Sequence, residues 1–130
     1  MQDGIHYIFI ADTTGMASAY PTLKERLGTA AYQHVTLLYC SGSNQYIFRK
    51  ELEILQSHYP TQFFVSYHSN ALDGHCILQQ EDIEVIVNAN TMQQMSFVIS
   101  GKAEFTTKIT DFLTFLGIKD IQIHKQYFSE

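Results

Sequence analysis

Five short apolar runs, separated by segments with helical spacing, form the main pattern of this chain. The runs cover residues 5–10, 34–40, 62–67, 95–99 and 120–124. Within the second and fourth runs, residues 35–39 and 97–99 are nearly continuous in apolar or β-branched side chains, as strands covered by helices on both faces require. The alternation predicts an α/β fold built on a parallel sheet.

The segments between the runs carry helical periodicity. Residues 17–27 are expected to form a helix, and an amphipathic stretch over residues 47–58 should end before Pro60. Apolar residues at positions 109, 112, 113 and 116 predict a further helix, with Gly117 as its C-terminal cap because glycine adopts positive φ without penalty.

The segment before the fourth run fits two structures. Residues 81–88 are expected to form a helix, although Ile83, Val85, Ile86 and Val87 would also suit a strand. Residues 70–75, which precede this segment, are expected to form a loop.

Parallel sheets of this kind bind ligands beyond the carboxyl ends of their strands, where the strand order reverses. The loops expected there cover residues 12–15, 40–45, 68–75, 100–104 and 125–130. The first contains Gly15 and leads into a helix, whose free N–H groups and dipole attract anions such as pyrophosphate. An ordinary strand-to-helix turn without a ligand explains this single stretch at least as well.

Composition and charge narrow the class of protein. With 130 residues, 45% apolar and 16% charged, the chain is expected to form one globular domain. A net charge of −5 with only 8 basic residues argues against nucleic acid as a partner. No apolar run reaches the length of a membrane span, and residues 1–4 lack the features of a signal peptide, so we expect a cytoplasmic protein. Cys40 and Cys76 could pair, but in that compartment they are expected to be reduced thiols.

Three of the expected loops, taken in order, resemble the NAD(P)-binding domain of the ferredoxin–NADP reductase family. Residues 10–18, Ile-Ala-Asp-Thr-Thr-Gly-Met-Ala-Ser, are similar to the family pattern Ile-Ala-Gly-Gly-Thr-Gly-Ile-Ala/Thr-Pro. Residues 35–52 resemble its second strand, ribose-reading loop and helix start, and residues 95–101 its apolar strand and Cys-Gly-Pro turn. Residues 117–128 look like its closing strand and terminal Glu-x-Phe.

The resemblance implies a three-layer fold with five parallel strands in the order 3-2-1-4-5 and helices on both faces. Family members bind NAD or NADP in this domain and pass hydride to FAD held in a separate barrel domain. Residues 1–130 would form only the NAD(P)-binding-like half, since no room for a barrel precedes Ile5. The implied partners are a flavin-binding domain or subunit, or a second copy packed on the face that a barrel would cover.

The resemblance also implies which residues form the site. The side chains beside the nicotinamide would be Ser100 and Phe128. The cofactor would be bound by Thr13, Thr14, Gly15, Met16, Ser41, Gly42, Ser43, Asn44, Gly101 and Lys102. The choice between NAD and NADP stays open, because the loop after residue 40 has neither an acidic residue for a ribose hydroxyl pair nor an arginine for a 2′-phosphate.

Several positions depart from the family pattern. Asp12 and Thr13 replace glycines, Ser18 replaces a proline and would cap the helix, Ser100 replaces cysteine, Lys102 replaces proline, and Gln126 replaces glutamate. The Asp12 carboxylate would repel a diphosphate unless it turns away or pairs. Two hypotheses follow: a nucleotide-binding oxidoreductase domain, or a degenerate, non-catalytic α/β interaction module.

Other candidate chemistry is weaker. His68, Asp73, His75 and Cys76 share one segment, but their spacing matches no compact zinc pattern, so no metal site is predicted. Arg49 is interpreted as a solvated residue of a first helical turn. His6 and His34, in or beside strands, are interpreted as packed or interfacial side chains.

Overall fold

The structure is a computed structural model that describes residues 2–29, 33–41, 46–69, 80–90, 92–119 and 122–128. Strands and helices alternate along these residues: β1 (Gln2–Asp12), α1 (Thr13–Thr29), β2 (Gln33–Ser41), α2 (Arg49–His58), β3 (Phe63–Ser69), α3 (Gln80–Ala89), β4 (Met92–Lys102), α4 (Ala103–Phe115) and β5 (Ile123–Phe128). The strands form one parallel sheet in the order β3-β2-β1-β4-β5. The predicted fold class and strand order are confirmed.

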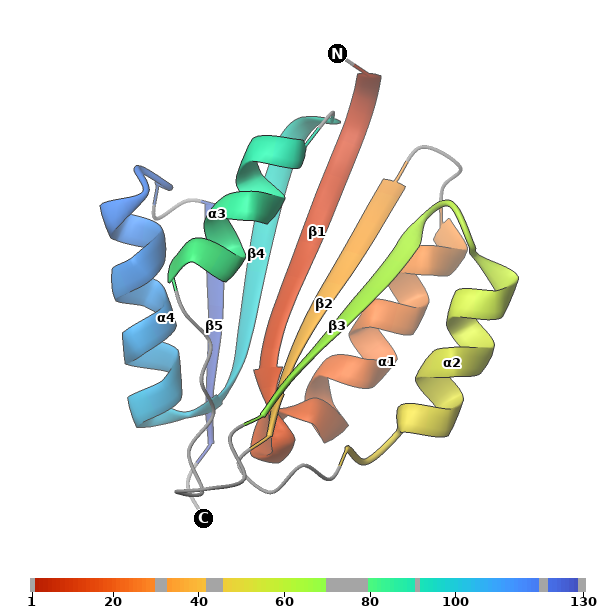
Figure 1. Ribbon diagram of the computed structural model, residues 1–130, viewed down its shortest axis with the longest axis horizontal. Helices are drawn as coiled ribbons and strands as arrows, with labels where there is room; N and C mark the ends of the chain where they lie inside the picture. Colours follow the sequence, from red (N-terminus) through yellow and green to blue (C-terminus); the bar gives the residue numbers. More distant parts are fainter. Residues whose placement is uncertain are drawn as a thin grey trace.

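Helices α1 and α2 cover one face of the sheet, and α3 and α4 cover the other (Figure 1). The central strand β1 shows why: Phe9 and Ala11 belong to the core with α1 and α2, whereas Ile8 and Ile10 belong to the core with α3 and α4. All four are fully buried. Alternate residues of a strand point to opposite faces, so a continuous apolar run is the pattern of a strand with no solvent face.

Helix α3 resolves the one ambiguous segment. Residues Gln80–Ala89 form a helix in which Ile83 is buried in the core, while Val85 is 66% exposed. A strand with alternating burial would have placed these two side chains on the same face. The strand alternative is therefore wrong.

Gly117 ends α4 as predicted. Its φ is +87°, and its N–H donates to the carbonyl of Thr114 while the N–H of Ile118 donates to the carbonyl of Leu113. This pair of bonds is a Schellman motif, which satisfies helix-terminal carbonyls that otherwise lack partners.

Several expected boundaries were wrong at the carboxyl ends of the strands. Helix α1 begins at Thr13, not at residue 17, and continues through Pro21. Strand β4 extends to Lys102 and passes directly into α4. The segments expected as loops over residues 12–15 and 100–104 are therefore strand ends joined to first helical turns. Strand β5 covers Ile123–Phe128 and not residues 120–124.

Cys40 lies at the end of β2, 1% exposed, and is disulfide-bonded. The expectation of two reduced thiols was therefore wrong. It was drawn from the presumed compartment, and spacing along the chain carries no information about whether two thiols meet in space. Cys76 lies outside the described residues.

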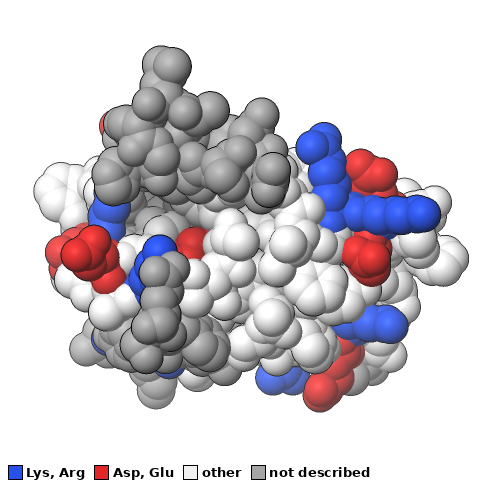
Figure 2. Space-filling model, turned by 90° about the horizontal axis from the view of Figure 1, so that it is seen from below, with Lys and Arg blue, Asp and Glu red and all other residues white. Residues whose placement is uncertain are grey.

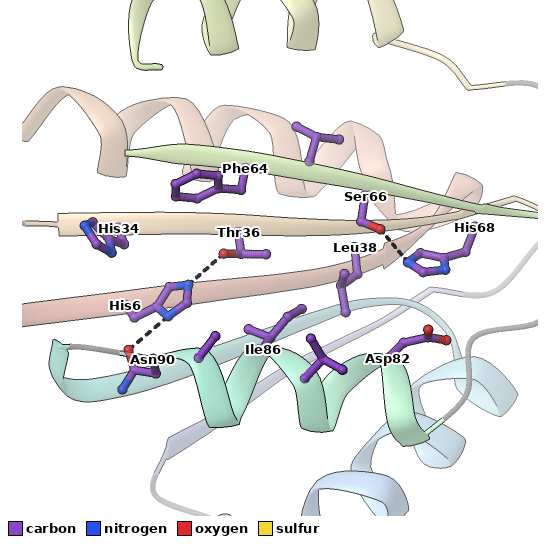
Figure 3. Close-up of a pocket in the computed structure, with 13 residues that line it drawn as sticks. His6, His34, Thr36, Leu38, Phe64, Ser66, His68, Asp82, Ile86 and Asn90 are labelled. Carbon is purple, nitrogen blue, oxygen red and sulfur yellow. Dashed lines mark hydrogen bonds between the residues drawn. The ribbon is translucent and has the colours of Figure 1, made fainter. Parts of the chain in front are cut away.

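A buried polar chain connects β1, β2 and the end of α3 (Figure 3). His6 is 7% exposed; its Nε2 lies 2.7 Å from Thr36 Oγ1 and its Nδ1 lies 3.1 Å from Asn90 Oδ1. The prediction that His6 is a packed side chain is confirmed. Burial lowers the pKa of His6 from its usual 6.5; the hydrogen bond to Asn90 acts in the opposite direction, and nearby His34 lowers the pKa further.

This lowered pKa makes stability depend on pH. The unfolded chain binds a proton to His6 more readily, so the stabilisation is complete above pH 6.5 and is lost as the pH falls below it. We expect the urea midpoint to fall between about pH 7.5 and pH 5.5, and to fall less in His6→Asn. Part of the dependence should remain, because burial also lowers the pKa of His68. The control Gln56→Asn, at an exposed position of α2 without a titratable side chain, should leave the slope unchanged. Equal slopes in wild type and His6→Asn would contradict the assignment.

Candidate functional site

The strand order reverses between β1 and β4, which are neighbours in the sheet although β2 and β3 separate them in sequence. Ala11 pairs with Ser100 near the carboxyl ends of these strands. Helices α1 and α4 start immediately afterwards, so both helix N-termini lie at this edge. Open parallel sheets bind their ligands at such a switch point, and the sequence predicted a ligand site at this edge.

The Asp12 carboxylate occupies the space between the two helix starts. Its Oδ1 accepts a hydrogen bond of 2.8 Å from the N–H of Gly15, and its Oδ2 accepts one of 3.0 Å from the N–H of Lys102. The first bond makes Asp12 the N-cap of α1. Ser18 lies within α1 and does not cap it, so that expectation was wrong.

Gly15 is required by close approach of the backbone. A Cβ at this position would lie 2.1 Å from the carbonyl oxygen of Ser100 and 2.6 Å from the nitrogen of Gly101. The fully buried Ser100 donates through Oγ to the carbonyl of Gly15 at 3.0 Å. Gly15 therefore serves the contact between α1 and β4 whether or not a ligand binds.

Two departures from the family pattern are joined in one contact. A proline at position 102 would have no N–H, whereas Lys102 supplies the N–H that Asp12 accepts. Gly101 completes the arrangement, since a Cβ there would lie 2.6 Å from the carboxylate atoms of Asp12. Asp12, Gly101 and Lys102 thus form one unit, which we call the carboxylate bridge.

The structure brings some of the predicted site residues together. Thr13 is exposed and Thr14 is half-buried in the first turn of α1. They lie between Asp12, which is bonded to Lys102, and Gly15, which is bonded to Ser100. Met16, by contrast, is fully buried in the core.

The remaining predicted residues lie on other strands or beyond the described residues. Ser41 ends β2 and is 1% exposed. Phe128 ends β5 and pairs with Lys102. Gly42, Ser43 and Asn44 are outside the part of the chain that the structure describes.

An aromatic cluster near the carboxyl ends of β2 and β3 was not predicted. Tyr46 packs edge-on against Tyr39 and Tyr67, with ring centroids 5.0 and 4.8 Å apart. The Arg49 guanidinium lies 4.9 Å from the Tyr67 ring centroid and 3.5 Å from Glu53, and the side chain is 57% exposed. Arg49 is solvated at the start of α2, as predicted, and also stacks on an aromatic ring. Burial raises the pKa of Tyr39 to about 12, so its hydroxyl stays neutral.

Charged side chains are unevenly distributed over the described part of this edge, which Figure 2 views directly. Among the residues coloured there, those across the middle are mainly neither acidic nor basic, and charged side chains gather toward the two sides. No group of three or more potential metal ligands occurs among the described residues. The same part of the chain contains no helix long and apolar enough to cross a membrane.

Comparisons with solved structures agree with the fold. The CS-b5R domains of human Ncb5or in their NAD⁺ form match 92% of this chain with a TM-score of 0.79 and 18% identity. Ferredoxin–NADP⁺ reductase from Plasmodium falciparum matches 95% with a TM-score of 0.73 and 20% identity. The FAD/NAD-binding domain of a nitric oxide dioxygenase from Vibrio cholerae matches 95% with a TM-score of 0.61 and 19% identity.

This chain has the fold of the NAD(P)-binding domains of ferredoxin reductase-like proteins, as the resemblance implied. It spans about half or less of those proteins: 52% of the Plasmodium reductase, 51% of the Vibrio protein and 36% of the human one. No family model and no curated protein matches the sequence.

Proposed function

We propose that this chain is a ferredoxin reductase-like domain of an oxidoreductase system in which Asp12 has replaced the nucleotide's diphosphate. The carboxylate bridge carries this proposal. Asp12 takes the N–H groups of Gly15 and Lys102, at the starts of the two helices that meet at the switch point. The domain would then act as a non-catalytic module that packs against a flavin-binding domain or subunit.

Electrostatics supports loss of nucleotide binding. The Asp12 carboxylate repels an anion held about 4 Å away. This repulsion makes the free energy of binding less favourable by about 1 kcal/mol in bulk water and by about 4 kcal/mol at the effective dielectric of a protein surface. These energies correspond to roughly 5- to 1000-fold weaker binding. The carboxylate also removes two donors that a phosphate would use, so both effects act in the same direction.

A second candidate function is retained binding of NAD(P)H, with hydride passed to a flavin held elsewhere. The position of Thr13 and Thr14 favours it, because N–H groups in a first helical turn have no partner within the helix. The neighbours include an NAD⁺ form and an FAD/NAD-binding domain, which supports the same reading. A diphosphate would have to displace the Asp12 carboxylate or lie beside it.

Calorimetric titration separates the two functions. With wild-type protein, we expect no saturable heat from NADH, NADPH or inorganic pyrophosphate at concentrations up to about 1 mM. Asp12→Asn removes the charge but keeps an acceptor at the N-cap. This variant should bind NADH, NADPH and pyrophosphate at least about tenfold more tightly than wild type. The matched control is Asp111→Asn, which removes one acidic charge from the exposed face of α4 and should bind no better than wild type.

Each outcome decides between the candidates. Sub-millimolar binding of either nucleotide to wild-type protein would establish the second function and refute the first. Binding that appears only in Asp12→Asn would support the role assigned to the carboxylate bridge. Circular dichroism on all variants excludes loss of the fold as the reason for any absence of heat.

A further inference from the structure

A groove opens between α3 and strands β2 and β3, on the face of the sheet opposite α1 and α2 (Figure 3). Its volume is about 540 Å³, which is within the range of small-molecule pockets. The core under α3 and α4 takes residues from β1, β2, β4 and β5 but, among the described residues, none from β3, so this edge strand is only partly covered on this side. The groove lies away from the carboxylate bridge and is independent of the function proposed above.

The two ends of the groove are polar and its middle is apolar. His6, His34 and Asn90 lie at one end, and Ser66, His68 and Asp82 at the other, as Figure 3 shows. The side chains between them include Leu38, Phe64 and Ile86. A pocket of this kind binds an apolar body through burial and orients it through a few hydrogen-bonding groups.

The polar groups are held in place by contacts with their neighbours. At one end His6 bonds to Thr36 and Asn90, and its ring contacts His34 with centroids 6.0 Å apart. At the other end Ser66 Oγ lies 2.9 Å from His68 Nε2. Because these side chains are already positioned, a ligand would bear little of the cost of ordering them.

The apolar groups at the rim are more exposed than a core requires. Phe64 is 45% exposed and Val85 is 66% exposed, and they line the groove from β3 and α3 respectively. They are two of the five large apolar side chains that are exposed in the described part of the chain. Covering them with an apolar ligand is favourable because it removes apolar area from water.

Charge selects the chemical class of the ligand. The described residues that line the groove include Asp82 and three histidines but no lysine or arginine, and burial lowers the pKa of His6 and of His68. A carboxylate or phosphate would therefore meet the negative charge of Asp82 with no permanent cation from this lining beside it. Asp82 accepts hydrogen bonds, so a hydroxyl or amino group suits that end. Phe64 and His34 offer ring surfaces, with centroids 6.3 Å apart, to an aromatic body.

We propose that the groove between α3 and strands β2 and β3 binds a neutral aromatic compound of one or two rings that carries a hydroxyl or amino group. The ring lies against Phe64 and Ile86, and the polar group faces Asp82. The size of the groove limits the ligand to a small molecule.

The test is an NMR titration of the ¹⁵N-labelled chain with 2-naphthol and, separately, with 2-naphthoate. These probes share one ring system and differ in the charge of the substituent. We expect saturable shifts for 2-naphthol at groove residues such as Ser66 and Ile86, with a Kd of about 1 mM or below. Binding of 2-naphthoate should be at least about tenfold weaker.

Two variants place the ligand in the groove. Ala89→Trp and Val85→Trp each put a large ring into it from exposed positions on α3, and should weaken 2-naphthol binding at least about tenfold. The matched control Ser57→Trp, exposed on α2, should bind like wild type. Both groove positions are exposed, so the fold should persist, and two-dimensional spectra of each variant check this.

Three results would overturn the assignment. The first is an absence of saturable shifts in the groove, and the second is equal affinity for 2-naphthoate. The third is a wild-type dimer in sedimentation that Ala89→Trp and Val85→Trp, but not Ser57→Trp, convert to monomer. That outcome would mean that the groove is covered by a second copy of the chain.

Discussion

Replacing Gly15 by alanine should lower the free energy of unfolding by at least about 3 kcal/mol. The new Cβ would lie 2.1 Å from the carbonyl oxygen and 2.2 Å from the carbonyl carbon of Ser100. Both atoms belong to the backbone of β4, so no side-chain rotation can relieve the overlap, and α1 would have to move away from the sheet. Urea denaturation followed by circular dichroism measures the loss.

Gly28 provides the matched control within the same helix. A Cβ at Gly28 would meet nothing within 4 Å, so Gly28→Ala should be neutral or stabilise α1 by up to about 1 kcal/mol. If Gly15→Ala and Gly28→Ala have the same stability, the close contact between α1 and β4 does not exist in solution. The comparison needs no ligand, so it tests the architecture separately from the function.

The second large effect should appear in a double-mutant cycle through the carboxylate bridge. Asp12→Ala removes the acceptor for the N–H groups of Gly15 and Lys102 and should lower the free energy of unfolding by about 1–3 kcal/mol. Gly101→Ala should cost a similar amount, because its Cβ would lie 2.6 Å from the Asp12 carboxylate and displace it from both donors.

The two losses should not add. Once Asp12 is alanine, the carboxylate that Gly101→Ala would displace is gone, so the second substitution should cost less than about 1 kcal/mol. The measured interaction energy should therefore equal most of the loss that Gly101→Ala causes in wild type. Additive losses would show that Gly101 is needed for a reason other than room for Asp12.

Most of the fold could be predicted from the sequence because burial on both faces leaves a clear pattern. A strand such as β1, in which Ile8, Phe9, Ile10 and Ala11 are all fully buried, must be a continuous apolar run. The cap at Gly117 was also predictable, since glycine follows the last apolar residue of the helical pattern. The strand order needed the resemblance, because periodicity does not encode which strands are neighbours.

The helix starts were the least predictable part. Residues 12–15 hold small and polar side chains without helical periodicity, so they have the pattern of a turn. Their helical conformation follows from the Asp12 cap and from the contact of Gly15 with β4, a segment 85 residues away in sequence. The conflict between Asp12 and a diphosphate was predictable from the sequence. The sequence pattern does not indicate which N–H groups donate to the carboxylate.

Nothing in the sequence pattern indicated the groove between α3 and strands β2 and β3. His6, His34 and His68 belong to three different strands, and only the order β3-β2-β1 places their strands side by side. Alternation along each strand then brings Thr36, Ser66 and the histidines to the face that α3 covers incompletely. Such a site depends on which helices leave part of a sheet uncovered, and that is a property of the assembled fold.

The hydrogen bond between Asp12 and the N–H of Lys102 also limits how this domain can change by mutation. A proline at position 102 would leave one oxygen of Asp12 without its donor, and a glycine at position 12 would leave the Lys102 amide without its acceptor. Either substitution alone is therefore expected to lower stability. Positions 12 and 102 are coupled, so the cost of a change at one of them depends on which residue occupies the other.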